Sequence, residues 1–296
     1  MHARSPLLEK ISISRPPRSH KRMKIMIFFP ILLVPTIYYG LEIFQTVEHS
    51  NQYDSVSPVL PRELVSPAIL VFSKTNSYRH ESINAANTMF REIANGRGWG
   101  IFETENGAVF DAAQLGRFKA VVWNNVSGDV LTPPQQEAFK SYIEAGGGFV
   151  GVHGSGGDPS YRWRWYVDTL IGAQFVGHTM SPQFRQATVK IEDRESPIMK
   201  GLDATWIRTD EWYSFDRSVR AKGYHVLATL DELSYQPEPN LSMGVDHPIV
   251  WTHCVGSGRT LYSAMGHQSS AYSEPKYVAV LTNAIVWAAG IEGGGC

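Results

Sequence analysis

The sequence is poor in cysteine and in net charge. Its 296 residues include only two cysteines, Cys254 and Cys296, and carry a formal net charge of −1. Two cysteines cannot build a disulfide framework, and they do not supply a thiolate metal cluster. A nearly neutral chain has no overall electrostatic attraction to nucleic acid, so we expect no nucleic-acid partner. The hydrophobic content of 43% is ordinary for one large or two small globular domains.

Short motifs for metal binding and for nucleophilic catalysis are also missing. The chain has no H-x-H or H-E-x-x-H spacing, including at His80. The G-x-S-x-G pattern of serine hydrolases fails around Ser155, because His153 takes the place of the first glycine. These absences weaken two alternatives but leave both open. One is a metal-dependent hydrolase with dispersed histidine ligands, and the other is a serine hydrolase that uses Ser155, Asp210 and His267.

The first 66 residues differ in composition from the rest. Residues 1–24 are basic and polar, which is typical of a disordered tail. Residues 25–41 carry no charge, and this run is at the lower end of the length that crosses a bilayer. We interpret residues 25–44 as an uncleaved signal-anchor, one N-terminal transmembrane helix, because no small-residue cleavage site follows. A cleaved signal peptide and a buried core helix are the alternatives. Residues 45–66 then form a polar linker.

A signal-anchor with a basic N-terminal flank keeps that flank in the cytoplasm. We therefore expect a chain that is membrane-anchored through this single segment, with its domain on the extracytoplasmic (periplasmic) side.

Residues 67–291 show the alternation of strands and helices that is typical of an α/β domain. Strands are expected at 68–72, 99–103, 120–123, 149–152, 186–191, 224–230, 249–253 and 260–264. Helices are expected from Glu81, over 111–118 and 132–144, after Asp158, and from Ser273 to Gly290. The last two strands flank a short glycine-containing turn and should pair as an antiparallel hairpin. The rest of the pattern predicts a mostly parallel central sheet with helices on both faces.

The glycine-rich stretch 146–157 is the most informative part of this domain. An apolar strand, Phe149–Val152, ends on His153, and four small residues follow. This arrangement places an imidazole at the carboxyl edge of the sheet, where ligands of open α/β sheets bind. The backbone amides of 154–157 could bind an anion or an oxygen atom beside it.

Polar side chains gather in five segments that we expect to be loops after strands. These segments are Arg79–Glu81, His153, Gly177–Thr179, Asp210–Tyr213 and Gly266–Gln268. Histidine acts near pH 7 as an acid, a base or a ligand. One histidine in such a place often satisfies a buried carbonyl, but several at equivalent places favour a common pocket. We expect His153, His178 and His267 to share one cavity.

These segments, in this order, resemble the ThuA-like (trehalose utilisation) domain, a relative of class I glutamine amidotransferase folds. The resemblance covers about residues 68–289. It rests on Tyr78–Ser82, Gly147–His153, Gly177–His178, Asp210–Tyr213, His247–Trp251 and Gly258–His267. It implies a flavodoxin-like three-layer α/β/α sandwich and a role with trehalose, related disaccharides or keto-sugars.

The resemblance also places His153 where amidotransferases carry their nucleophilic cysteine. Because no cysteine lies there, glutamine hydrolysis through a thioester is excluded. A sugar-modifying enzyme of hydrolase, lyase or isomerase type remains, as does a non-catalytic module that binds a sugar. The sequence leaves open whether the chain is an enzyme.

We predict a sugar site made of two sets of residues. Acid–base chemistry is assigned to His153, His267, Asp210 and Glu211, because a carboxylate orients an imidazole and makes it more basic. Contact with the sugar is assigned to His80, Glu81, His178, Tyr213, Tyr78, Ser155 and Arg259. No metal ligand and no cofactor is assigned. The expected partners are a small-molecule sugar and the membrane, and a homo-oligomer is compatible with the sequence.

Overall fold

The computed structural model describes residues 52–292. The predicted basic tail, the signal-anchor at 25–44 and the first part of the linker lie outside the described residues. Within 52–292, no helix is both long and apolar enough to span a membrane. The anchor and the extracytoplasmic location therefore stay predictions.

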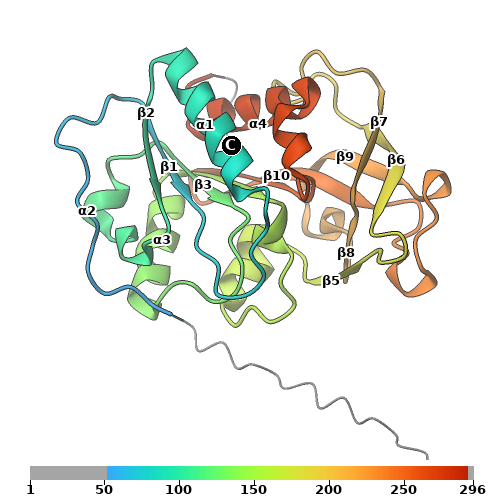
Figure 1. Cartoon of the computed structure of the whole chain (residues 1–296), viewed down its shortest axis with the longest axis horizontal. Helices are drawn as coiled ribbons and strands as arrows, with labels where there is room; N and C mark the ends of the chain where they lie inside the picture. Colours follow the sequence, from blue (N-terminus) through green and yellow to red (C-terminus); the bar gives the residue numbers. More distant parts are fainter. Residues whose placement is uncertain (1–51, 293–296) are drawn as a thin grey trace, which may run out of the picture. The chain divides into compact units, whose positions relative to one another are not determined.

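A large mixed sheet organises the described residues (Figure 1). Its nine strands have the order β2-β1-β3-β4-β11-β10-β9-β6-β7. The first five run parallel: β2 (Gly100–Thr104), β1 (Ala68–Phe72), β3 (Ala120–Asn124), β4 (Gly148–Val152) and β11 (Gly258–Ser263). The others pair antiparallel: β10 (Pro248–Val255), β9 (His225–Asp231), β6 (Phe184–Ile191) and β7 (Thr205–Glu211). The predicted mixed α/β class and the β10–β11 hairpin are confirmed, but the sheet is parallel in only one half.

The strands of the parallel half are buried on both faces, whereas the antiparallel half includes a strand with one exposed face. Every residue of β1, β3 and β4 is buried, as expected for parallel strands covered on both faces. Strand β7 instead alternates exposed and buried residues along Thr205–Asp210, which is typical of an antiparallel strand with one wet face.

Three strands are not predicted from the sequence. The prediction that Gly177–Thr179 and Asp210–Tyr213 are loops is wrong. His178 ends β5 (Phe175–His178), and Asp210 and Glu211 end β7. Strand β8 (Tyr213–Phe215) follows directly and pairs with β5 as a separate two-stranded ribbon. Strands β5 and β8 have only four and three residues, and β7 buries charged side chains, so none of them has the apolar run on which the prediction depended.

Helices cover both faces of the parallel half (Figure 1). Helices α1 (Ile83–Arg97) and α4 (Pro275–Ala288) lie on one face, and α2 (Ala112–Leu115) and α3 (Pro133–Glu144) on the other. Thr132 begins α3 as predicted, since Gln135 accepts a hydrogen bond from its backbone N–H at 2.8 Å. The helix predicted after Asp158 is shorter than expected, a π-helix over Tyr166–Ile171.

Strand order explains how distant segments meet. Strands β4 and β11 are adjacent, with Val152 opposite Ser263. The residues that follow them, His153 and the segment 264–267, therefore leave the sheet side by side. The loop after β1 carries His80 to the same edge, because the carboxyl ends of parallel strands share that edge.

Residues 52–66, the described part of the predicted linker, lie along the domain as an extended arm. Asp54 is its main attachment. One carboxylate oxygen of Asp54 accepts hydrogen bonds from Lys74 Nζ at 2.5 Å and from the Gly107 amide at 2.8 Å. The Asp54 carbonyl accepts another from Gln135 at 2.7 Å. Because Lys74 lies in the loop that leads to His80, the arm helps to fix that loop.

We expect Asp54→Ala to lower the free energy of unfolding by about 1–3 kcal/mol, because Lys74 and the Gly107 amide lose their partner. Urea denaturation measures this change. Asp203→Ala is the matched control, since Asp203 pairs with Lys276 at the surface and is 80% exposed; its effect should stay within about 0.5 kcal/mol. Equal effects of the two substitutions would contradict a structural role for the arm.

Candidate functional site

His153 occupies the turn directly after β4 and is fully buried. Its φ of 42° lies in the left-handed region, which is strained for any residue with a Cβ and is often found at active sites. Its Nδ1 lies 2.8 Å from the carbonyl of Ala264. Because a carbonyl only accepts, Nδ1 donates to it, and Nε2 faces the interior of the site.

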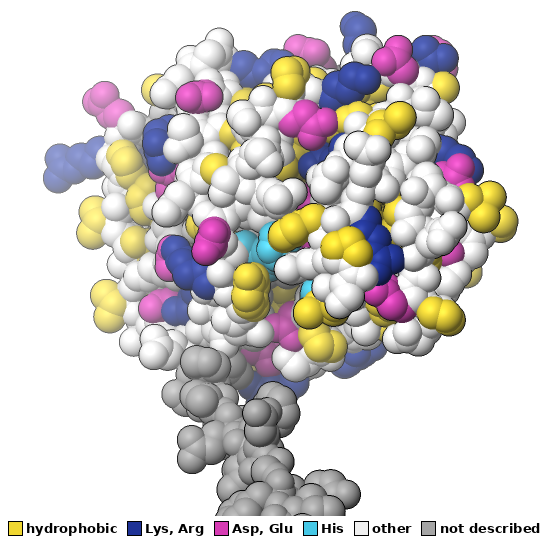
Figure 2. Space-filling model, turned by 45° about the vertical axis from the view of Figure 1, so that its right-hand side comes forward, with side chains coloured by type: hydrophobic (Ala, Val, Ile, Leu, Met, Phe, Trp, Pro, Cys, Tyr) yellow, Lys and Arg dark blue, Asp and Glu magenta, His cyan; other side chains and the backbone are white. Residues whose placement is uncertain are grey.

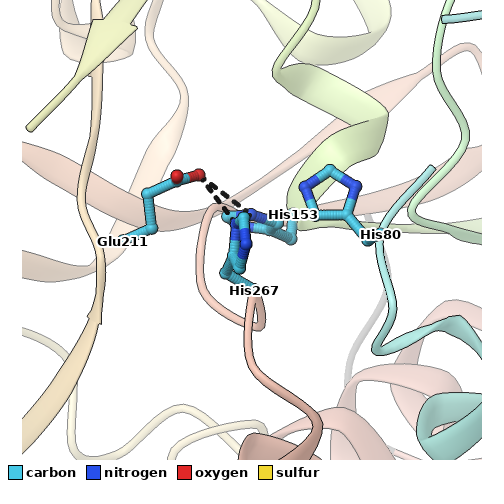
Figure 3. Close-up of side chains that lie close together, drawn as sticks. All are labelled: His80, His153, Glu211 and His267. Atoms are coloured by element: carbon cyan, nitrogen blue, oxygen red, sulfur yellow. Dashed lines mark hydrogen bonds and ion pairs between the residues drawn. The ribbon is translucent and has the colours of Figure 1, made fainter. Parts of the chain in front are cut away.

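Two groups lie close to Nε2 of His153 (Figure 3). His267 Nδ1 lies 3.2 Å from His153 Nε2, and Glu211 Oε2 lies 3.4 Å from the same atom. His267 Nδ1 and Glu211 Oε2 are themselves 2.9 Å apart. Three atoms that can each donate an electron pair thus form a small triangle, although they come from the loop after β4, the loop after β11 and the end of β7.

His80 completes the group. Its ring centroid lies 4.8 Å from those of His153 and His267, and it is nearly perpendicular to both rings. Gly154 permits this approach, because a Cβ there would come within 2.7 Å of the His80 ring. His80 is buried, and its Nδ1 has no hydrogen-bond partner among residues 52–292. A buried nitrogen without a partner is costly unless something else binds the ring.

The electrostatics favour a neutral His80 beside an ionised Glu211 carboxylate. Burial, with smaller contributions from His153 and His267, lowers the pKa of His80 to about 2. Burial raises the pKa of Glu211, but hydrogen bonds from His153 and His267 outweigh it, so that this pKa lies well below its usual value. At neutral pH His80 therefore offers a nitrogen lone pair and Glu211 a negative charge, the state in which such side chains bind metal ions.

The spacing of three of the four candidate ligand atoms fits one metal ion. The candidate ligand atoms of His80, His153, Glu211 and His267 all lie within 4.8 Å of one another; the widest separation exceeds two metal–ligand bonds, so the His80 ring would have to move inward to bind the same ion. Two ligands bound at about 2.0–2.2 Å to one tetrahedral ion are about 3.3–3.6 Å apart. The separations of 2.9, 3.2 and 3.4 Å among three of the atoms are close to this range. Three nitrogens and one oxygen suit zinc or a similar transition metal better than magnesium or calcium.

His80, Glu211 and His267 line a hollow of about 250 Å³, and the buried His153 lies behind them. In Figure 2, histidine side chains are visible in a depression that hydrophobic side chains border. The hollow is lined by Tyr78, His80, Gly157, Phe175, His178, Met180, Gln183, Glu211, Tyr213 and His267. The Tyr213 ring stacks on His153 at 4.2 Å between centroids and closes the inner wall.

His178 and Gln183 contact the other oxygen of Glu211. His178 Nδ1 lies 3.2 Å from Glu211 Oε1, and Gln183 Nε2 donates to the same oxygen at 2.5 Å. The side chain of His178 is 25% exposed, so it is the imidazole of this group that is most open to solvent. These contacts hold the carboxylate in one orientation, as outer partners of metal ligands do.

The structure brings together most, but not all, of the predicted site residues. His80, His178, Glu211, Tyr213, His267 and Tyr78 line the hollow, whereas the buried His153 does not line it and contacts His267 from behind at 3.2 Å. Glu81 is exposed and does not line it. Arg259 donates to the carbonyl of Trp287 at 2.9 Å, so its guanidinium contacts the last helix. Ser155 is buried and donates to the carbonyl of Val152, which gives it no contact with an imidazole.

Asp210 lies behind the group instead of within the hollow. Its carboxylate accepts hydrogen bonds from the backbone amides of Gly266 at 2.8 Å and His267 at 3.2 Å. It also pairs with the buried guanidinium of Arg208 at 2.8 Å. Consecutive strand residues point to opposite faces, which explains why Asp210 and its neighbour Glu211 act on different sides. Asp210 therefore positions the loop that carries His267 and does not itself meet a substrate.

Three residues of the hollow were not predicted: Phe175, Met180 and Gln183. Met180 lies two positions after His178. Its proximity to a predicted residue could therefore have identified it from the sequence. Gln183 is separated from Glu211 by 28 positions and carries no motif. Only the antiparallel pairing of β6 with β7, which sets Phe184 opposite Glu211, brings it there.

We expect Asp210→Asn to lower the free energy of unfolding by about 3–5 kcal/mol, because Arg208 loses its buried countercharge. Chemical denaturation of the two proteins measures the difference. Asp168→Asn is the control, since Asp168 pairs with Arg164 at the surface with 49% of its side chain exposed. An effect of Asp210→Asn no larger than that of the control would show that Asp210 does not position the loop.

Comparison with known proteins agrees with this fold. The family model of ThuA, described as trehalose utilisation, matches residues 68–288. A ThuA-like protein from Bacteroides uniformis is 25% identical with a TM-score of 0.65, over 79% of this chain and 95% of that one. A ThuA-like protein from Parabacteroides merdae is 16% identical with a TM-score of 0.60, over 78% and 91%. A search of curated proteins found no match.

The second likeness shows the fold alone, whereas the family model covers most of the chain and includes His80, His153, Glu211 and His267. The chain therefore belongs to the ThuA (trehalose utilisation) family.

Proposed function

We propose that this domain is a metal-dependent enzyme that binds and transforms a sugar in the hollow above His80, His153, Glu211 and His267. One observation carries the proposal: four ligand atoms, contributed by four separate segments, converge within 4.8 Å at the closed end of a cavity. Imidazole nitrogens that face one another do not stabilise the fold by themselves. Packing alone therefore does not explain why three imidazoles are gathered here.

The contacts of these side chains support an ion at this place. His153 Nδ1 donates to the Ala264 carbonyl, and its Nε2 faces His267 Nδ1 and Glu211 Oε2. His267 Nδ1 lies within hydrogen-bond distance of both His153 and Glu211. His80 stays neutral, because its pKa is about 2. A divalent cation would satisfy all four groups at once, and buried charges are normally paired or bound to metals.

The hollow supports a sugar as substrate. Its walls combine aromatic rings, from Tyr78, Phe175 and Tyr213, with hydrogen-bonding groups such as Gln183 and His178. Small-molecule sites share this mixture of apolar surface and few polar groups. The family is described by trehalose utilisation, which favours a disaccharide or a related keto-sugar over other polar ligands.

The residues divide the chemistry between them. A bound ion would polarise a carbonyl or hydroxyl oxygen of the sugar and stabilise negative charge on it. His178 lies at the open side, with Nδ1 3.2 Å from the ionised Glu211, and can carry a proton to or from the sugar. Tyr213 and the turn at Gly154 exclude water from the inner face of His153. The class of reaction is thus proton transfer on a sugar, as in hydrolysis, elimination or isomerisation.

A second candidate is metal-free acid–base catalysis by the same side chains. The hydrogen bond of 2.9 Å between His267 and Glu211 favours it, because a carboxylate that holds an imidazole makes it a stronger base. Removal of the metal distinguishes the two candidate functions, because only the metal-dependent enzyme would lose its turnover.

The test is turnover of a panel of disaccharides and their 3-keto forms by the full chain, before and after chelation. We expect chelation to abolish turnover and zinc or a similar ion to restore it. His80→Ala and His267→Ala should each weaken metal binding by more than about 100-fold, since loss of a ligand costs more than loss of its outer partner.

His225→Ala is the matched control. His225 is a surface histidine with 57% of its side chain exposed and pairs with Asp193. Metal content and turnover of this variant should equal those of the unmodified chain. Turnover that survives chelation would favour the metal-free candidate, and no turnover or binding of any sugar would refute the assignment to carbohydrate chemistry.

A further inference from the structure

We infer that the hollow takes a single sugar ring from the end of a glycoside, and that Tyr78 and Met180 at its rim hold the next, unphosphorylated unit. This inference rests on the proposed function, and it adds the mode of binding and two specificity-determining residues. Three observations lead to it: the size and blind end of the hollow, the exposed apolar rim, and the absence of cationic side chains from its lining.

The size of the hollow limits what enters it. Its volume of about 250 Å³ is below the range of about 300–1,000 Å³ that encloses a drug-sized ligand, so it has room for one sugar ring and not for two. The inner end is blind, because His153 is 0% exposed and Glu211 2%. The ring of Tyr213 lines the hollow and stacks on the buried His153, so that the two rings close this side. A chain that continued in both directions could not fit, so only a terminal ring reaches the ligand group.

The rim offers apolar contact to whatever extends from the hollow. Tyr78 is 58% exposed and Met180 is 64% exposed, although both side chains are large and hydrophobic. Tyr78 packs edge-to-face on His80 with 4.7 Å between ring centroids, which fixes its orientation at the mouth. Rigid aromatic and adaptable methionine side chains suit the apolar face of a sugar ring. Because the first sugar ring fills the hollow, the side chains of Tyr78 and Met180 are available to contact the second sugar unit.

The side chains at the rim argue against a phosphate group on the second sugar unit, which lies away from the proposed ion. None of the described residues that line the hollow is lysine or arginine. The two arginines nearest in sequence to its rim, Arg79 and Arg185, pair with Glu105 at 2.7 Å and with Glu238 at 2.6 Å. Recognition of phosphate normally relies on arginine or lysine, so a phosphate on the second unit lacks its partner here.

The experiment measures binding of three sugars to the full chain loaded with zinc, by calorimetry: glucose, trehalose and trehalose 6-phosphate. We expect trehalose to bind more tightly than glucose and than its phosphate. Tyr78→Ala and Met180→Ala should each weaken trehalose binding by about 3- to 10-fold and change glucose binding by less than about 2-fold.

Leu233→Ala is the control for loss of an exposed apolar side chain, since Leu233 is 88% exposed and does not line the hollow. It should leave all three affinities unchanged. Equal weakening of glucose and trehalose by the rim variants, or tighter binding of the phosphate, would overturn this inference while the proposed function stands. If none of the three sugars binds, this inference fails; the proposed function fails as well only if the wider panel of disaccharides and 3-keto forms is neither bound nor turned over.

Discussion

The carboxylate of Glu211 is the group on which the site depends. It is 2% exposed and ionised, and it accepts contacts from His153, His267, His178 and Gln183. An ionised carboxylate at that depth is unfavourable unless compensating groups surround it. Four segments of the chain therefore have to meet at one point, and the fold is arranged so that they do.

The mixed sheet makes this meeting possible. Its parallel half brings the loops after β1, β4 and β11 to one edge, and these loops carry the three imidazoles. Its antiparallel half supplies the carboxylate from the end of β7. Asp210 then links the two halves, because it joins β7 to the backbone of the loop that holds His267. The site thus combines loops of the parallel half with the end of the outermost antiparallel strand.

Much of the parallel half could be predicted from the sequence. Short apolar runs such as Ala68–Phe72 and Phe149–Val152 usually form buried strands, as they do here. The turn predicted after Val152 gave the correct position of His153. The antiparallel half could not be predicted, because β5 has only four residues and the buried positions of β7 include the charged Arg208 and Asp210. For the same reason Asp210 and Glu211 looked equivalent in the sequence. Only their placement at the end of a strand shows that one faces the hollow and the other the loop behind it.

The most direct measurement is anomalous diffraction from crystals of the protein grown with zinc, recorded at the zinc absorption edge. Our account predicts one ion at the closed end of the hollow, bound by nitrogens of His80, His153 and His267 and by an oxygen of Glu211. Absence of an anomalous peak within reach of these four side chains, at a zinc concentration that saturates other histidine-rich sites, would contradict it.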